Sequence, residues 1–252
     1  MNQAEAKNDK ESDRTRTSRF ATTHWTVVLA AGQPGTSRYQ QALETLCRTY
    51  WFPLYAYLRR CGHDTHNAEE HTQAFFASLL EKGGLRLADP NRGKFRSFLL
   101  AALKHFLADE RDRALALKRG GGRKVVSLDV GDAETRYALE PATHSSPERL
   151  FEKSWAMTVL ARAMAQLKAE SAGANKQKLF DRLKSYLTAE KGSDPYRDAA
   201  ADLNMTEGAV KVAVHRLRRR YRQLVRDEIA QTVATEDQIA EEIRDLFNAL
   251  AY

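Results

Sequence analysis

Hydrophobic residues recur with helical spacing along most of the chain, and this pattern predicts helices separated by short breaks. Apolar residues from Tyr39 to Tyr50 follow a helical period that resumes beyond Pro53, which predicts two consecutive helices. Further helices are predicted over 65–80, 95–118, 150–167, 179–189, 195–227 and 236–250. Strand-like alternation extends no further than Val125-Val126, so the predicted fold class is all-α.

Residues that favour helix ends accompany this pattern. Asp64 or Thr65 is suited to cap one helix, and Gly83-Gly84 to end it. Ser146 is suited to cap a later helix, because Pro147 follows it at the first helical position. These caps place helix boundaries independently of the hydrophobic period.

Composition divides the chain into two helical domains. Gly120-Gly121-Gly122 ends the first group of helices, and residues 123–146 lack a sustained period and are rich in Asp, Glu, Pro, Thr and Ser, which indicates a flexible linker. The predicted parts are a disordered tail (1–19), a first helical domain (20–120), an acidic linker (121–146), a second helical domain (147–228) and a C-terminal helical extension (229–252).

The overall composition is typical of a soluble globular protein. The 252 residues are 42% hydrophobic and 29% charged. No apolar run approaches the roughly 18 residues of a membrane helix, and the first twenty residues carry both charges without the apolar centre of a secretory signal. Two cysteines, Cys47 and Cys61, exclude a disulfide scaffold. We therefore expect a cytoplasmic protein without a membrane partner.

Charge is arranged in blocks, and the chain has a net charge of +7. Residues 92–124 contain ten Lys and Arg against three acids, and residues 153–228 contain sixteen against nine. Residues 125–152 contain six acids against two bases, and residues 229–252 contain five against one. Two basic blocks separated by an acidic spacer favour a polyanion that is bound at two places.

Residues 196–220 carry the clearest motif, a helix-turn-helix. Ala200 is small where two helices cross, Asn204 suits a left-handed turn and Thr206 is suited to cap the second helix. Positions spaced for burial are Val210, Val214, Leu217, Tyr221 and Leu224, and those on the other side are Lys211, His215, Arg218, Arg219 and Arg222. Such a basic stripe suits the DNA major groove, although a solvated helix face is the alternative. Phosphate contacts are assigned to Arg216, Arg219 and Arg220.

A second basic group lies in the predicted helix 95–118 and in the turn before it. Its members are Arg92, Lys94, Arg96, Lys104, His105, Arg111, Arg113, Lys118 and Arg119. Phe95, Phe98 and Phe106 are interleaved with them, and aromatic and basic side chains together suit single-stranded nucleic acid. For Phe98 and Phe106, burial in a helical core is the favoured interpretation. The basic turn 90–94 is suited to hold an extruded base.

Cys61, His63, His66 and His71 suggest a metal site. The segment from His66 to His71 is one residue longer than the inverted zincin motif H-x-x-E-H, so its two imidazoles do not share a helix face. Walker, G-x-S-x-G and G-x-G-x-x-G motifs are missing from the sequence. We expect no metal, no cofactor and no catalysis; a metal-dependent hydrolase built on 63–71 is the least favoured alternative.

Four segments follow one another in an order that is typical of one protein family. They are residues 68–76 (AEEHTQAFF), residues 93–99 (GKFRSFL), Ser146-Pro147-Glu148 and the helix-turn-helix. The chain resembles the extracytoplasmic-function class of bacterial RNA polymerase sigma factors, over about residues 38–120 and 147–228. The resemblance implies sigma domain 2 in the first helical domain and sigma domain 4 in the second. The implied function is transcription initiation: binding of core RNA polymerase, promoter recognition and promoter melting.

The resemblance also implies roles for individual residues. The clamp helices of the polymerase β′ subunit are expected on Glu69, Glu70 and Gln73, and the β flap on domain 4. Minus-ten promoter DNA is expected on Arg92, Lys94, Arg96, Lys104, His105, Arg111 and Arg113. The minus-thirty-five element is expected on Thr206, Glu207, Lys211, His215, Arg216, Arg218, Arg219 and Arg220.

The segment expected to bind the polymerase clamp departs from the family pattern. Asn67, His71 and Ala74 occupy positions where the family is richer in acid, so docking on a basic clamp should be weakened. Thr72 lies in the same segment, and some related sigma factors that lack these acids work with Ser/Thr kinases. Phosphorylation adds about −1.5 to −2 charge. We hypothesise that phosphorylation of Thr72 switches on polymerase binding; an ordinary helix threonine is the alternative.

The C-terminal extension and the partners allow further hypotheses. The predicted helix 236–250 places Ile239, Ile243, Leu246 and Leu250 on one face. We hypothesise that this helix biases the chain towards a closed, inactive state. An anti-sigma factor is another candidate partner. The alternative function is an operator-binding helix-turn-helix regulator that acts without polymerase.

Overall fold

The computed structural model describes residues 26–33, 38–89, 92–116, 133–138, 146–188 and 196–251. Every regular element in these ranges is a helix and none is a strand, which confirms the all-α prediction. The predicted tail 1–19 and most of the predicted linker 121–146 lie outside the described residues. Within the described ranges, no helix combines the length and the apolar character that crossing a membrane requires.

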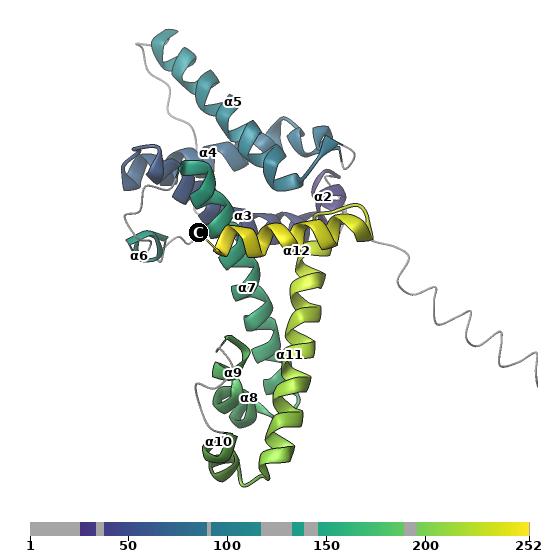
Figure 1. Cartoon of the computed structure of the whole chain (residues 1–252). Helices are drawn as coiled ribbons and strands as arrows, with labels where there is room; N and C mark the ends of the chain where they lie inside the picture. Colours follow the sequence, from purple (N-terminus) through teal and green to yellow (C-terminus); the bar gives the residue numbers. More distant parts are fainter. Residues whose placement is uncertain are drawn as a thin grey trace, which may run out of the picture.

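Helix α3 (Tyr39–Arg60) is the central element of the upper body in Figure 1. Every residue from Trp51 to Leu58 is buried. Pro53 lies inside this single helix, so the prediction of two consecutive helices is wrong. Proline lacks the N–H that would continue the backbone ladder, but burial of the surrounding aromatic side chains offsets the loss.

The first half of the chain packs around α3. Its other helices are α2 (Thr26–Ala31), α4 (Thr65–Glu81), the 3₁₀ helix η2 (Gly84–Leu87) and α5 (Phe95–Ala116). Asp64 caps α4 as predicted, because its carboxylate accepts a hydrogen bond of 2.8 Å from the backbone N–H of Asn67. The C-terminal end of α5 projects away from the body (Figure 1).

A short helix, α6 (Ala133–Ala138), lies within the segment predicted as a flexible linker and docks on α3. The Tyr55 hydroxyl donates a hydrogen bond to Glu134, and Arg59 Nη2 lies 2.9 Å from the other carboxylate oxygen of Glu134. The Arg136 guanidinium lies 3.7 Å from the ring centroid of Phe52. The linker prediction is therefore wrong for these six residues.

Two long helices, α7 (Pro147–Gly173) and α11 (Glu207–Ala230), connect the upper body to a lower lobe (Figure 1). The lobe is completed by α8 (Gln177–Leu183), α9 (Ser185–Thr188) and α10 (Tyr196–Leu203). Ser146 caps α7 as predicted, accepting a hydrogen bond of 3.3 Å from the Arg149 N–H.

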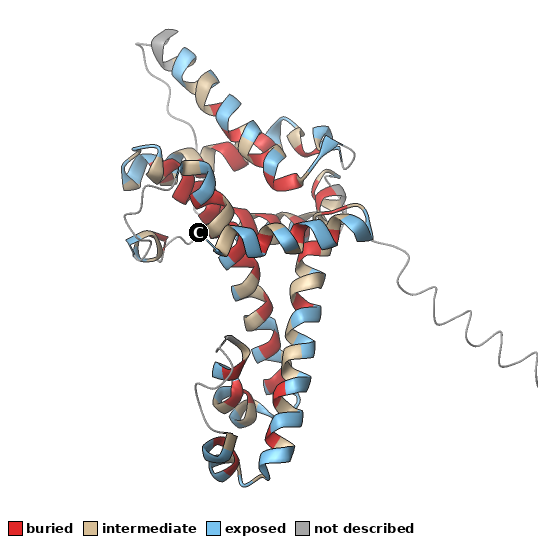
Figure 2. Cartoon of the chain, in the orientation of Figure 1, coloured by how far each residue is buried: buried red, intermediate tan, exposed pale blue. Residues whose placement is uncertain are grey.

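The main hydrophobic core lies where the upper body meets α7, α11 and α12 (Glu236–Leu250), as the buried residues in Figure 2 show. Phe151, Trp155 and Ile229 belong to the same cluster as Tyr55. The lower lobe has two smaller clusters of its own. The predicted division at residue 147 therefore does not coincide with a break in packing.

Helix α12 has the bounds that the sequence predicts and crosses α7 and α11 near their upper ends (Figure 1). Thr235 and Gln238 form a capping box at its N-terminus. Ile239 and Leu246 are buried, and Ile243 is half-buried on the same face. The helix thus completes the main core.

Candidate nucleic-acid interface

The turn between α10 and α11 has the geometry that the sequence predicts. Asn204 adopts a left-handed backbone conformation with φ 51°. The Thr206 hydroxyl accepts a hydrogen bond of 3.2 Å from the Ala209 N–H, which caps α11. Ala200 is buried where the two helices meet. A helix-turn-helix is therefore formed, with the N-terminus of α11 at the end of the lobe (Figure 1).

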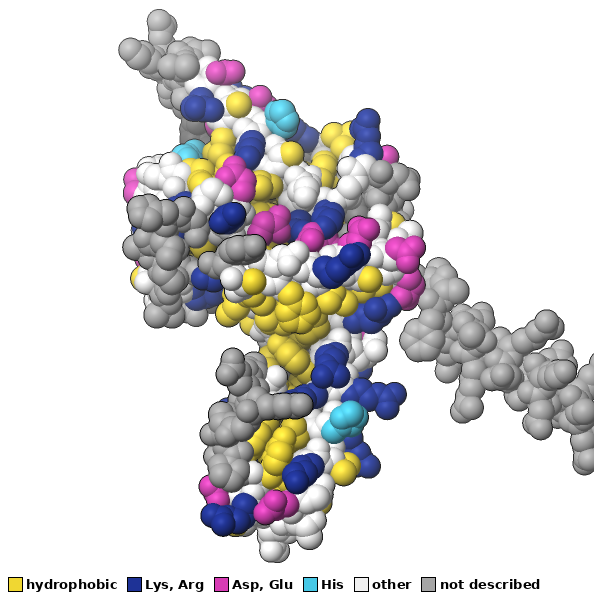
Figure 3. All heavy atoms as spheres, viewed as in Figure 1, with side chains coloured by type: hydrophobic (Ala, Val, Ile, Leu, Met, Phe, Trp, Pro, Cys, Tyr) yellow, Lys and Arg dark blue, Asp and Glu magenta, His cyan; other side chains and the backbone are white. Residues whose placement is uncertain are grey.

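Helix α11 presents a basic stripe to solvent. Its exposed members are Lys211, His215, Arg219 and Arg222, and Thr206 and Glu207 are exposed at the start of the helix. Val210, Val214 and Leu224 are buried on the opposite side, and Leu217 and Tyr221 are half-buried. Figure 3 shows Lys and Arg side chains along this helix in the lower lobe. The predicted separation of apolar and basic faces is confirmed for these residues.

Arg218 differs from the other members of the predicted stripe. It is half-buried, and its Nε and Nη2 both donate hydrogen bonds to the backbone carbonyl of Tyr186, at 3.1 and 2.7 Å. This contact holds α9 against α11. The prediction that Arg218 faces DNA is therefore corrected to a structural role in this conformation.

Arg216 and Arg220 line a groove of about 600 Å³ between α7, α8 and α11, beside the stripe. Arg220 forms a two-pronged ion pair with Glu170, with Nη2–Oε1 and Nε–Oε2 distances of 2.6 and 2.8 Å. This hydrogen bonding lowers the pKa of Glu170 below its ordinary value. Arg220 is thus occupied in this structure, whereas Arg216 is exposed at the groove.

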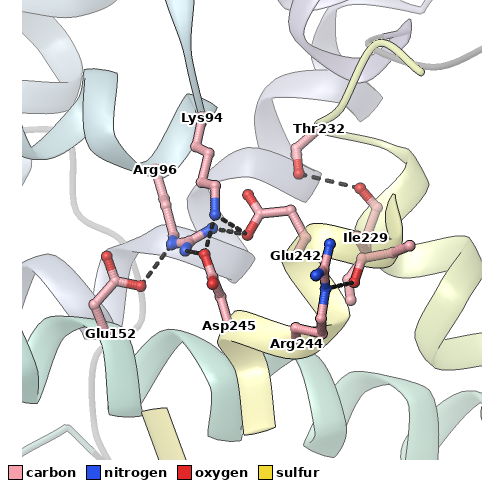
Figure 4. Close-up of polar contacts among 9 residues, drawn as sticks. Lys94, Arg96, Glu152, Ile229, Thr232, Glu242, Arg244 and Asp245 are labelled. Atoms are coloured by element: carbon pink, nitrogen blue, oxygen red, sulfur yellow. Dashed lines mark hydrogen bonds and ion pairs between the residues drawn. The ribbon is translucent and has the colours of Figure 1, made fainter. Parts of the chain in front are cut away.

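Lys94 and Arg96, predicted to contact minus-ten DNA, are covered by α12 (Figure 4). Arg96 is 4% exposed and binds three carboxylates: Glu152 through Nε at 2.5 Å, Asp245 through Nη2 at 2.8 Å, and Glu242 through Nη1. Lys94 pairs with Asp245, and its ammonium lies 3.9 Å from Glu242. Neither base is free to bind DNA in this conformation, so the predicted contact with minus-ten DNA requires α12 to move away.

The acidic partners of this cluster, Glu242 and Asp245, lie far along the chain from Lys94 and Arg96, so no local pattern indicates them. Glu242 and Asp245 are three positions apart on α12, so they share a helix face. The signal that could have found them is the charge pattern, because the acidic block 229–252 complements the basic block 92–124.

The other predicted minus-ten residues lie on or near the exposed side of α5. Arg92, His105 and Arg111 are exposed, and Lys104 forms an exposed ion pair of 2.8 Å with Glu148. Arg113 is half-buried and pairs with Glu110 at 2.6 Å. Burial of Phe106 confirms its core assignment, Phe98 is half-buried, and the buried Phe95 offers no ring for stacking on a base. Lys118 and Arg119 lie outside the described residues.

The residues predicted to bind the polymerase clamp lie on α4. Glu70 is exposed, and Glu69 and Gln73 are half-buried. Thr72 is 0% exposed, and its hydroxyl donates a hydrogen bond of 2.7 Å to the Ala68 carbonyl. The hydroxyl is closed to a kinase in this fold, so phosphorylation of Thr72 requires α4 to move first.

His63 and His71 form an edge-to-face pair with ring centroids 5.1 Å apart. Burial and the neighbouring His71 lower the pKa of His63. In the described part of the chain, no three His, Cys, Asp or Glu side chains are grouped so that they could hold a metal ion. The hydrolase alternative therefore gains no support from this segment.

Comparison of the chain with protein-family models, with curated proteins and with solved structures gives no match. Its function is therefore inferred from the geometry above and from the resemblance of its motifs.

Proposed function

We propose that the chain is a transcription initiation factor that binds core RNA polymerase and directs it to specific promoters. The observation that carries the proposal is the exposed basic stripe on α11, presented by a capped helix-turn-helix. Lys211, His215 and Arg219 are free to enter a major groove, and their positive charge suits the DNA backbone. The order of motifs resembles that of extracytoplasmic-function sigma factors. This resemblance supports the proposed binding to core RNA polymerase.

The proposed division of work follows that resemblance. Residues 20–120 serve as sigma domain 2, with Glu69, Glu70 and Gln73 on the β′ clamp helices and with promoter melting by the basic residues of α5. Residues 147–228 serve as sigma domain 4, on the minus-thirty-five element and the β flap. The chain works in the cytoplasm without catalysis of its own. Helix α12 pairs with Lys94 and Arg96, so these residues can bind minus-ten DNA only after α12 has moved away. This supports control of promoter binding by α12.

The decisive experiment combines a pull-down of core RNA polymerase by the full chain with transcription in vitro from a promoter library. We expect stable association and transcription that depends on the chain. DNA binding by the helix-turn-helix without polymerase association would support the operator-binding alternative instead.

A matched pair of variants tests the stripe itself. K211A/R219A removes two exposed charges from α11, and K168A/K178A removes two exposed charges from α7 and α8. For duplex promoter DNA, we expect the first pair to weaken binding and to reduce the slope of log affinity against log salt by about 0.9, from the lost phosphate contact of Arg219. Equal effects of the two pairs would contradict binding through the stripe.

A further inference from the structure

Lys94 has its carboxylate partners on α12. Its ammonium group pairs with Asp245 and lies 3.9 Å from Glu242, as Figure 4 shows. Glu242 is only 3% exposed, and a carboxylate that is buried to this extent is stable only when cations offset its lost hydration. Lys94 and Arg96 supply those cations. The contact is therefore specific, in contrast to an exposed surface ion pair.

Arg96 is held from two sides, and this distinguishes it from Lys94. Its Nε bonds Glu152 of α7, and its guanidinium lies 4.3 Å from the ring centroid of Trp155, also on α7. Neither contact involves a residue of α12, so movement of α12 does not by itself break them. Departure of α12 thus frees the Lys94 ammonium and leaves Arg96 with part of its guanidinium open.

The connection of α12 to the rest of the chain allows such a movement. Residues 231–235 form a turn after α11, and α12 begins with its own capping box. The helix therefore has local stabilisation that does not depend on α11. Its attachment to the body includes the buried face with Ile239 and Leu246, the Glu242 and Asp245 carboxylates, the ion pair of Glu236 with Arg226 of α11, and the buried Val233 of the preceding turn.

We propose that Glu242 and Asp245 occupy the positions of nucleic-acid phosphates on Lys94 and Arg96, so that single-stranded DNA and α12 compete for these two side chains. Carboxylates and phosphates accept the same charge-assisted hydrogen bonds from ammonium and guanidinium groups. Both bases lie at the N-terminal end of α5, where the helix dipole favours an anion of either kind. That the competing ligand is DNA rests on the proposed function. That α12 competes with an anionic ligand rests on the ion pairs of Glu242 and Asp245 with Lys94 and Arg96.

The test measures binding of a short fluorescein-labelled single-stranded oligonucleotide of mixed sequence to the full chain, by anisotropy at several salt concentrations. E242Q/D245N keeps the side-chain shapes and removes the competing charges. We expect tighter binding and a salt slope steeper by about 1.4, from two added contacts at roughly 0.7 each. The control D227N/D237N removes two charges from exposed positions of α11 and α12 and should leave the slope unchanged.

A third variant separates freed bases from a general change of charge. Adding K94A to E242Q/D245N should abolish most of the gain in affinity. The proposal is overturned if E242Q/D245N binds no tighter than D227N/D237N, or if the gain in affinity survives K94A. If the double variant unfolds, D245N alone serves, because the Asp245 side chain is 35% exposed. The assay contains no polymerase, so its result is independent of whether the chain binds core polymerase.

Discussion

The guanidinium of Arg218 donates two hydrogen bonds to the backbone carbonyl of Tyr186, at 3.1 Å from Nε and 2.7 Å from Nη2. Arg219, the next residue of α11, is exposed. Two adjacent arginines of one basic helix thus have separate tasks: the first fixes α9 against α11, and the second is available to a ligand. Net charge alone does not distinguish them.

This difference predicts that substitutions of the two arginines affect different properties of the protein. Arg218→Ala should lower the free energy of unfolding by about 1 to 2 kcal/mol, because the Tyr186 carbonyl loses a charged donor. Arg219→Ala should change it by less than about 0.5 kcal/mol and should instead weaken DNA binding. Urea denaturation and DNA titration of both variants check this. If both substitutions lowered the free energy of unfolding equally, the hydrogen bonds from Arg218 to the Tyr186 carbonyl would make no net contribution to stability.

Features with local causes were predictable from the sequence. Asp64, Ser146 and Thr206 cap their helices as expected, because a cap needs only a short polar side chain and the N–H three residues later. The face of α12 with Ile239 and Leu246 followed from its helical period. The separation of apolar and basic faces on α11 followed in the same way.

Features with distant causes were not predictable. Pro53 favours a helix break locally, and only the buried surroundings of α3 keep the helix continuous. Lys94 and Asp245 are 151 positions apart, so no local pattern indicates that they meet. Residues 133–138 are helical where α6 docks on α3, a contact that composition does not reveal.

The left-handed turn before α11 predicts a test at Asn204. Its φ of 51° is unfavourable for most residues with a Cβ. Glycine adopts it without strain, and asparagine tolerates it better than most other residues. Asn204→Ala should destabilise the chain by about 1 kcal/mol, whereas Asn204→Gly should be close to neutral. Thermal unfolding of the two variants checks the order, and an alanine variant as stable as the parent would contradict the turn geometry.

The ion pair of Glu170 and Arg220 predicts a dependence of stability on pH. Hydrogen bonding from Arg220 lowers the pKa of Glu170 from its ordinary value of 4.5. The folded state therefore binds the proton less tightly than the unfolded state, so the contribution is complete above about pH 4.5 and is lost as pH falls through the lowered pKa. The stability difference between the parent and Glu170→Gln should shrink below pH 4.5. A difference that is constant with pH would exclude a contribution from this pair.

The packing of α12 predicts which of its residues contribute to the stability of the fold. Leu246 is buried in the main core, and Phe247 beside it is 64% exposed. Leu246→Ala should cost about 2 to 4 kcal/mol, and Phe247→Ala less than about 0.5 kcal/mol, in chemical denaturation. Deletion of residues 232–252 would expose the same core, so its effect on transcription would mix control with instability. Point substitutions at Glu242 and Asp245 avoid that problem.

The burial of Thr72 predicts that a phosphate mimic at this position disrupts the fold. Thr72→Asp would place a carboxylate in the core of the upper body, where an unpaired charge costs several kcal/mol. Thr72→Val loses only the hydroxyl bond to the Ala68 carbonyl and should cost about 1 kcal/mol or less. We therefore expect a large fall in melting temperature and weaker polymerase binding for Thr72→Asp, with Thr72→Val close to the parent in both. A Thr72→Asp chain that keeps its melting temperature and binds core polymerase more tightly would show instead that α4 opens readily, as the phosphorylation hypothesis requires.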